Sequence, residues 1–244
     1  GRDKQDTLRA EFLGGFEATV QRWTAALGPI AVAVADMNGD ALPDIVVLNT
    51  SDRVDGLPTF GGSITVLRNQ GGRSFRRDDP LTPNNLPWNT GGTFPRDLVV
   101  GDFIAIDRVT GGTRLGRDGF PDVAVAHFGN PDPLNFVTCA ALACEIDVMP
   151  NMTGFTSTTS GGAITFPVGG GAALAGSFAG LTRNSRPAVI AAGDLNGDGF
   201  LDLVSANGSD ITNTNGTTIT VRLGQPSGNF IDNDIDTNPT TTTP

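Results

Sequence analysis

The chain has 244 residues, and its apolar fraction of 38% is sufficient for one large all-β domain or two small ones. Its 26 acidic and 16 basic residues give a net charge of −10, which argues against binding to nucleic acid or to an anionic membrane by general electrostatics. The sequence has no run of about 18 apolar residues, so we expect no direct membrane insertion. The 33 glycines and 16 prolines predict many short strands separated by turns.

The first predicted unit spans residues 29–75 and begins at Pro29. A small apolar strand at 31–35 leads into a loop at 36–44, and a second apolar strand follows at 45–48. An alternating third strand at 62–67 is typical of a half-buried strand, and a glycine-bearing turn then ends at Phe75. The first two strands are therefore predicted to form a hairpin.

Oxygen-bearing side chains recur at fixed spacing in the loop of this unit. Asp36, Asn38, Asp40 and Asp44 stand at positions 1, 3, 5 and 9, and Leu42 at position 7 would add its backbone carbonyl. These are the ligands that a hard cation prefers, so the pattern predicts calcium. An EF-hand would require flanking helices, whereas the flanks here are strand-like. The loop is therefore interpreted as a calcium loop between strands.

The second predicted unit, residues 76–166, contains a split copy of the loop. Asp102 begins it and, after an insertion, Asp118, Phe120 and Asp122 supply positions 5, 7 and 9. Position 3 has no clear occupant, and Asp107 inside the insertion is the candidate substitute. Strands are predicted at 97–101, 123–126, 145–149 and 161–166.

The third predicted unit, residues 167–230, carries a complete copy of the loop. Its ligands, with Phe200 contributing a backbone carbonyl, are Asp194, Asn196, Asp198, Phe200 and Asp202. Strands are predicted at 188–193, 203–206 and 217–222. Residues 231–244 are rich in threonine, proline and aspartate and are predicted to be a linker or C-terminal tail. The three loops together predict two to three Ca²⁺ ions.

A polar residue ends the second strand of each unit, at Asn49, His127 and Asn207. Because asparagine fills this place in two units, the single histidine is predicted to make a strand-end hydrogen bond instead of acting as a base. The sequence also lacks the GxSxG, HExxH and GxxxxGK motifs, so we expect no catalytic residues, no cofactor other than calcium, and no enzyme.

The two cysteines, Cys139 and Cys144, have a spacing that fits neither a CxxC redox motif nor a haem attachment motif. A small loop-closing disulfide is the preferred interpretation, and two free thiols are the alternative. Together with loops that require abundant calcium, this favours an extracellular, cell-surface or periplasmic location. Four asparagines, Asn49, Asn151, Asn207 and Asn215, stand in N-glycosylation sequons, which an Asn- and Thr-rich chain also produces by chance.

Two stretches, PxxVAVADMNGDxxPDIVVLN from Pro29 and PAVIAAGDLNGDGFLDLVSAN from Pro187, resemble the FG-GAP/VCBS repeats of integrin-alpha-type β-propellers. The resemblance covers roughly residues 29–230. It implies an all-β fold of four-stranded antiparallel blades, with a calcium ion at each loop. About three full blades are expected, and residues 1–28 are expected to be the tail of a preceding blade or a ring-closing strand.

Three blades do not reach the four to eight that close a propeller. The chain is therefore a piece of a longer propeller, a compact four-bladed ring that uses its ends, or a subunit in an assembly of copies. The expected function is a noncatalytic module for protein or glycan recognition, adhesion or surface assembly, with a protein or glycan ligand, further blades or copies of the same chain as partners. The alternative is the propeller domain of a polysaccharide-degrading lyase or hydrolase.

Overall fold

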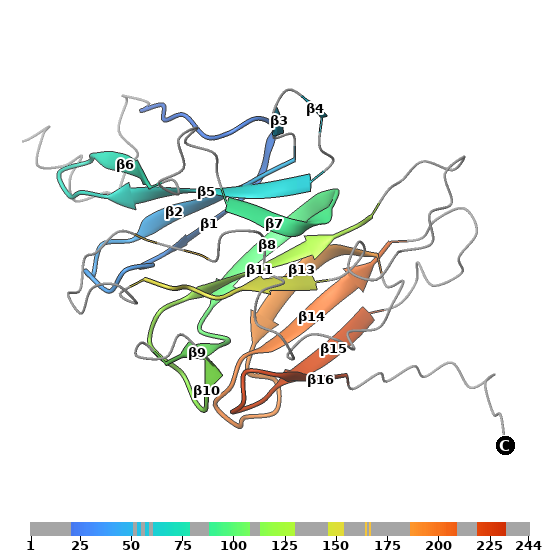
Figure 1. Cartoon of the computed structure of the whole chain (residues 1–244). Helices are drawn as coiled ribbons and strands as arrows, with labels where there is room; N and C mark the ends of the chain where they lie inside the picture. The colour runs from blue at the N-terminus through green and yellow to red at the C-terminus, as the bar shows by residue number, and fades with distance from the viewer. Residues whose placement is uncertain are drawn as a thin grey trace, which may run out of the picture.

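The computed structural model describes residues 21–50, 53–54, 57–58, 61–78, 88–107, 113–129, 146–153, 164, 166, 186–208 and 219–232. These residues form strands, turns and bends and no helix, and accordingly none of them forms a helix that could cross a membrane. Three antiparallel sheets lie one after another, and the middle sheet lies between the first and the third (Figure 1). The all-β class is confirmed.

The first sheet is built from the first predicted unit and the residues that follow it. Strands β1 (Pro29–Ala35), β2 (Asp44–Asn49), β5 (Gly61–Asn69) and β6 (Phe75–Asp78) pair in this order, and β7 (Trp88–Thr93) pairs with the start of β5. By this pairing the first sheet continues past the unit boundary predicted after residue 75. Between β2 and β5, the short strands β3 (Arg53–Val54) and β4 (Leu57–Pro58) pair with each other.

The middle sheet has three strands, in the order β12 (Ile146–Met149), β11 (Asp122–His127) and β8 (Pro95–Gly101). The insertion after Asp102 forms a small hairpin of its own, β9 (Ala105–Ile106) with β10 (Thr113–Arg114). The further strand predicted at 161–166 falls mainly outside the described residues; Ile164 and Phe166 are described, are buried, and are not in a strand.

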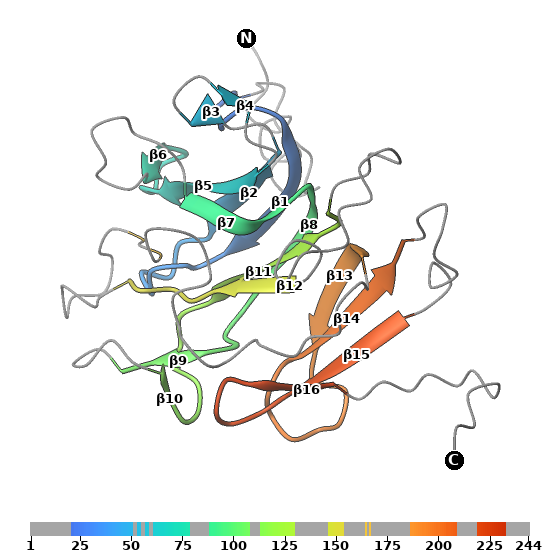
Figure 2. The ribbon, with the colours of Figure 1, turned by 45° about the vertical axis from the view of Figure 1, so that its right-hand side comes forward.

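The third sheet has four strands in sequence order: β13 (Pro187–Gly193), β14 (Asp202–Asn207), β15 (Ile219–Gly224) and β16 (Phe230–Asp232). The predicted antiparallel four-stranded sheets are thus present, and no closed ring is formed by the described part of the chain (Figure 2). The predicted N-terminal segment 1–28 is described only from residue 21, without a strand, and the tail 231–244 only to residue 232.

Each hairpin that carries a predicted calcium loop begins and ends in the same way. The residue before the proline has a positive φ, and its carbonyl accepts a hydrogen bond from the N–H of the residue after the second strand. These donor and acceptor pairs are Thr50 with Gly28 (3.0 Å), Phe128 with Phe94 (3.0 Å) and Gly208 with Arg186 (2.9 Å). The three hairpins are therefore equivalent in structure as well as in sequence.

The core lies between the sheets and consists of two apolar clusters. One cluster joins the first and middle sheets and contains Val46, Leu48 and Ile64 opposite Val123 and Val125. The other cluster joins the opposite face of the middle sheet to the third sheet and is made by Ala124, Ala126, Ile146, Val148, Ile190 and Leu203, among others. Because side chains alternate along a strand, β11 supplies Val123 and Val125 to one cluster and Ala124 and Ala126 to the other.

Buried polar contacts also join neighbouring sheets. Asn151, which follows β12, donates from Nδ2 to the carbonyl of Met37 in the first loop (2.8 Å) and to that of Pro121 in the split loop (2.9 Å). Between the middle and third sheets, the N–H of Ile190 donates to Asp97 Oδ2 at 3.0 Å. The successive sheets are thus held at a defined offset as well as packed through apolar side chains.

Candidate metal centres

The three predicted loops share one hydrogen-bonding pattern around their first aspartate. Asp36, Asp102 and Asp194 each accept main-chain N–H groups of the loop on both carboxylate oxygens. The donors to one oxygen are the position 5 residues, at 3.1 to 3.3 Å, and the donors to the other are the position 6 residues, at 2.8 to 2.9 Å. The loop backbone is therefore wound around this carboxylate.

The aspartate at position 5 orients the second half of each loop. Its Oδ1 accepts the N–H of the position 7 residue in all three copies, at 2.8 Å from Leu42, 3.0 Å from Phe120 and 2.8 Å from Phe200. In the two complete loops its Oδ2 accepts the amide of the position 3 asparagine, from Asn38 to Asp40 at 3.0 Å and from Asn196 to Asp198 at 2.9 Å. Positions 3 and 5 are thus next to each other on the loop.

The aspartate at position 9 is fully buried in every loop. Asp44, Asp122 and Asp202 are at most 1% exposed. One oxygen accepts the N–H of position 2, at 3.0, 2.9 and 2.7 Å, and the other accepts an N–H at or just after the end of the third strand, at 2.8 Å in every copy. The donors at the third strand are Asn69, Asn151 and Gly224. Each of these carboxylates therefore connects three strands of its sheet.

Burial disfavours the charged form of several of these carboxyl groups. Desolvation raises the pKa of Asp44 and of Asp102, and it raises the pKa of Asp122 well above its ordinary value. The nearby carboxylates of Asp40 and Asp36 raise the pKa of Asp44 further, while main-chain N–H donors oppose the shift. In the first and the split loop, the protein thus does not fully compensate the negative charge of these three carboxylates.

The split loop differs from the other two at position 3. Ile104 follows Phe103 there; its side chain is 1% exposed, and its N–H donates to Asp122 Oδ2 at 2.7 Å. The N–H of Ile106 donates to Asp118 Oδ2 at 3.2 Å, which replaces the asparagine amide of the complete loops. The split loop therefore has one oxygen ligand fewer next to Asp102, and the substitution by Asp107 stays a prediction.

By residue type, the two complete loops carry the oxygen donors that calcium prefers. Across the described ranges, no group of three or more His, Cys, Asp or Glu side chains is arranged to hold a metal ion, and the first aspartates accept main-chain N–H groups. A carboxylate has about four lone-pair sites, so an oxygen that accepts an N–H can also ligate a cation. The two complete loops thus offer three carboxylates, an amide oxygen and a position 7 carbonyl each to a hard ion.

The polar strand ends form a second feature that is common to the three sheets. Asn49 donates to Thr65 Oγ1 at 3.2 Å and Asn207 donates to Thr220 Oγ1 at 2.8 Å. In the middle sheet, His127 Nδ1 lies 3.0 Å from Asp147 Oδ2, at the place equivalent to those threonines. The pair Asn–Thr of two sheets is therefore replaced by His–Asp in the other.

His127 also contacts Thr90 of β7, with Nε2 2.9 Å from Oγ1. The order Thr90, His127, Asp147 matches a nucleophile, base and acid relay. However, Thr90 and His127 are both 0% exposed, and a side chain at Gly92 would overlap the imidazole ring. The predicted hydrogen bond of His127 at the strand end is confirmed, and its partner Thr90 is buried with it.

The repeated loop and hairpin geometry agrees with the comparison to known families. The family model for the FG-GAP repeat matches residues 187–221, which run from β13 into β15. The chain carries an FG-GAP repeat. No curated protein matches the sequence. Because the loop bonds of the FG-GAP repeat recur around Asp36 and Asp102, the first and middle sheets are built on the same hairpin.

Sequence reasoning missed two residues of the middle sheet: Asn151, which bonds to the first and the split loop, and Asp147, which pairs with His127. Asn151 and Asp147 lie on or beside the third strand of the middle sheet, and the alignment of that strand with Thr65 and Thr220 was the available signal. Three of the four sequon asparagines, Asn49, Asn151 and Asn207, are buried and hydrogen-bonded. Asn215 and both cysteines, Cys139 and Cys144, lie outside the described residues.

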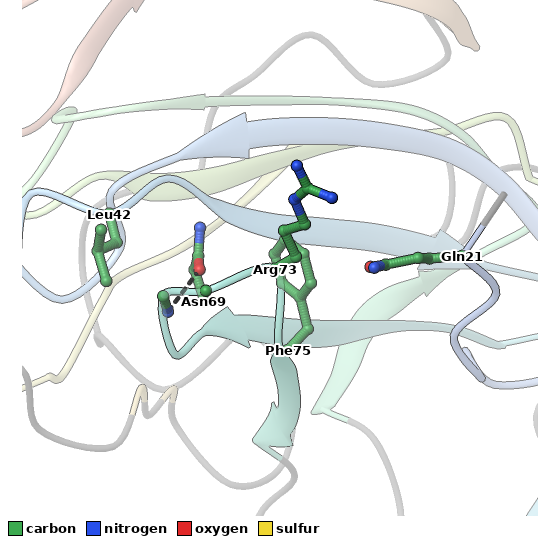
Figure 3. Close-up of a pocket in the computed structure, with 7 residues that line it drawn as sticks. Gln21, Leu42, Asn69, Arg73 and Phe75 are labelled. Atoms are coloured by element: carbon green, nitrogen blue, oxygen red, sulfur yellow. Dashed lines mark hydrogen bonds between the residues drawn. The ribbon is translucent and has the colours of Figure 1, made fainter. Parts of the chain in front are cut away.

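A pocket of about 540 Å³ lies beside the loop of the first sheet (Figure 3). It is open to solvent on one side, and its wall is the turn between β5 and β6, with Asn69, Arg73 and Phe75. Leu42 of the loop and Gln21 complete the lining. Trp23 packs edge-on against Phe75, with a centroid distance of 5.7 Å.

Position 6 of the loops allows a direct test of the backbone conformation. Ala41 has a φ of 66° and Gly199 a φ of 87°, and a methyl group at Gly199 would contact nothing. Gly199→Ala is expected to lower the free energy of unfolding by about 1 kcal/mol, because an L-residue is strained in the left-handed region. Ala41→Gly is expected to raise it or leave it unchanged, since relief of strain offsets the greater chain entropy of glycine. Urea unfolding in EDTA measures the free energy of unfolding of both variants. Equal losses in the two variants would contradict a left-handed backbone at position 6.

The strand-end pairs predict a coupled exchange in the middle sheet. His127→Asn and Asp147→Thr are each expected to destabilise, whereas the double variant recreates the Asn–Thr pair of the other sheets. We expect the double variant to lose less free energy of unfolding than the two single variants lose together, by about 0.5–3 kcal/mol. A double-mutant cycle by chemical denaturation gives this coupling, and strictly additive losses would show that the two positions do not act as a pair.

Proposed function

We propose that this chain is a noncatalytic, extracellular, calcium-binding β-propeller module that recognises a glycan or protein ligand. The observation that carries the proposal is the triple occurrence of one loop, in which the first aspartate is enclosed by main-chain N–H groups and the ninth holds three strands. An environment with abundant calcium would keep such loops filled, which supports a location outside the cytosol.

The proposed calcium ligands follow from the loop positions. In the first loop they are Asp36, Asn38, Asp40 and Asp44 with the carbonyl of Leu42, and the third loop repeats them from Asp194 to Asp202. Calcium would favour the charged form of Asp44, whose pKa is raised chiefly by burial and further by the carboxylates of Asp40 and Asp36. The split loop, with Ile104 at position 3, is proposed as the weakest site.

Calcium binding predicts a defined stoichiometry and a stability gain. A ligand that binds only the folded state stabilises it by about 2.7 kcal/mol at a free concentration of about 100 times Kd. Saturating Ca²⁺ is therefore expected to raise Tm by several degrees over EDTA, and calorimetric titration to give two strong sites. Asp194→Ala removes one site and Asp36→Ala the other, while Leu195→Ala, an exposed loop position without a side-chain oxygen, is the matched control. Identical melting curves with Ca²⁺ and EDTA would refute this.

The pocket beside the first loop supports glycan recognition without catalysis. Arg73, Asn69 and Gln21 provide polar groups, and Phe75 provides an aromatic surface (Figure 3). Among the described residues that line it there is neither a carboxylate nor a histidine, the groups that a glycosidase or lyase needs as acid and base. A guanidinium recognises carboxylate and sulfate groups well, so the proposed ligand class is an anionic glycan.

A glycan-binding assay separates recognition from the enzyme alternative. The wild-type chain is expected to bind an acidic oligosaccharide, and Arg73→Ala is expected to weaken the binding about tenfold or more, which corresponds to one lost charged hydrogen-bonding group. Arg76→Ala serves as the control, because Arg76 is exposed, pairs with Asp78 and does not line the pocket. Mass spectrometry of the incubated oligosaccharide is expected to show no cleavage; cleaved product would favour the polysaccharide-degrading enzyme instead.

A further inference from the structure

The two outermost sheets each present an apolar face that turns away from the middle sheet. We call the outer face of the first sheet the upstream face; its exposed residues on β1 are Ile30, Val32 and Val34. We call the outer face of the third sheet the downstream face; it is made by alternate residues of β13 to β16, namely Val189, Ala191, Val204, Ala206, Ile219, Val221, Leu223 and Ile231. Contiguous exposed apolar patches of this kind mark interaction sites.

The upstream face is a surface that the other two sheets bury. Val32 occupies the same place in its hairpin as Leu98 and Ile190, four residues before the first loop aspartate. Leu98 and Ile190 are 7% and 6% exposed because the preceding sheet covers them, whereas Val32 is 64% exposed. Val34 is likewise exposed, and Trp23 lies against Phe75 at the far side of this sheet. The uncovered part is therefore β1.

The downstream face shows the complementary pattern. One position on the third strand is isoleucine in every sheet, namely Ile64, Ile146 and Ile219. Each directly precedes the third-strand member of the strand-end pair. Ile64 is 0% and Ile146 1% exposed, since each packs against the following sheet and Ile64 also pairs with Trp88 of β7, whereas Ile219 is 66% exposed. Val66 and Val148 are buried in the same way, while their equivalent Val221 is only half-buried.

The contact between consecutive sheets is directional and is made twice within the chain. In both cases the downstream face of one sheet packs on the upstream face of the next. The described residues thus contain two complete contacts of this type and one exposed half at each end: the downstream face of the third sheet, and β1 on the upstream face of the first sheet, where Val47 and Leu67 of β2 and β5 are already buried. These two halves are of the two kinds that meet in the internal contacts, and their exposed residues are all apolar.

We propose that a second copy of this chain covers both faces, with the downstream face of each copy packed on the upstream face of the other. Such a contact is heterologous, and it closes when the rotation between the copies completes a ring. The described parts of two copies would supply six sheets of three or more strands, within the four to eight from which propellers close. The interaction requires neither calcium nor a glycan, so it stands or fails separately from the proposed function.

Sedimentation velocity over a range of protein concentrations tests the assembly. The wild-type chain is expected to form a dimer, and Val32→Asp in the upstream face or Ile219→Asp in the downstream face is expected to give monomers. Leu115→Asp is the control, because Leu115 is 74% exposed and belongs to neither face. All three positions are exposed, so circular dichroism should show folded proteins.

Mixing the two monomeric variants decides between a heterologous contact and other modes. Each variant retains the face that the other has lost, so an equimolar mixture is expected to form a one-to-one complex through one intact contact. A wild-type chain that stays monomeric at the highest concentration attainable would overturn the proposal. A dimer that both variants leave intact, or oligomers that grow beyond two copies, would overturn it as well.

Discussion

The structure depends on a buried carboxylate at the ninth loop position, which joins three strands in each sheet. Asp44, Asp122 and Asp202 accept one N–H from the loop and one from the third strand, and they are nearly inaccessible to solvent. A carboxylate whose oxygens are both hydrogen-bonded tolerates burial that an unpaired one does not. The hairpin, the loop and the third strand are therefore fixed relative to one another before any ion is considered.

The buried aspartate at position 9 explains how one loop both joins the strands of its sheet and keeps its own shape. The ninth aspartate fastens the loop to the sheet, while the first and fifth aspartates shape the loop itself and remain closer to solvent in the third sheet. In the first sheet, Asn151 of the neighbouring sheet contacts the Met37 carbonyl, so the loop is also part of the contact between sheets. A change at the loop is thus expected to reach both the sheet and its neighbour.

The middle sheet shows that the constraint survives when the loop is interrupted. The insertion with β9 and β10 enters between positions 3 and 5, yet the bonds of Asp122 to Phe103 and Asn151 are those of the other copies. What is lost is the asparagine at position 3, whose donor role passes to the N–H of Ile106. The strand-holding function of the loop is therefore separable from its full set of oxygen ligands.

Local patterns in the sequence were sufficient to predict the hairpins, because a proline, an apolar strand, an oxygen-rich loop and a second strand follow one another in every unit, interrupted only by the insertion in the middle one. Residues such as Asn151, Asp147 and Asp97 could not be assigned in this way, since each acts through a partner that is distant in sequence or in another sheet. Loop composition also suggested that the ninth aspartate is only a metal ligand. Its bonds to Asn69, Asn151 and Gly224 arise from the pairing of the third strand, which the loop sequence does not encode.

Stacked repeats contact only their neighbours, so the burial of a residue depends on which sheets flank it. Ile64 and Ile219 have the same side chain and the same register in their sheets, but they differ in their neighbours: the middle sheet packs on Ile64, and β7 pairs with it at Trp88. The difference of 0% against 66% in exposure therefore comes from the strands and sheets around each isoleucine and not from the residue itself. An exposed isoleucine at a position that its equivalents bury is for this reason evidence of an incomplete contact, and not of a surface adapted to water.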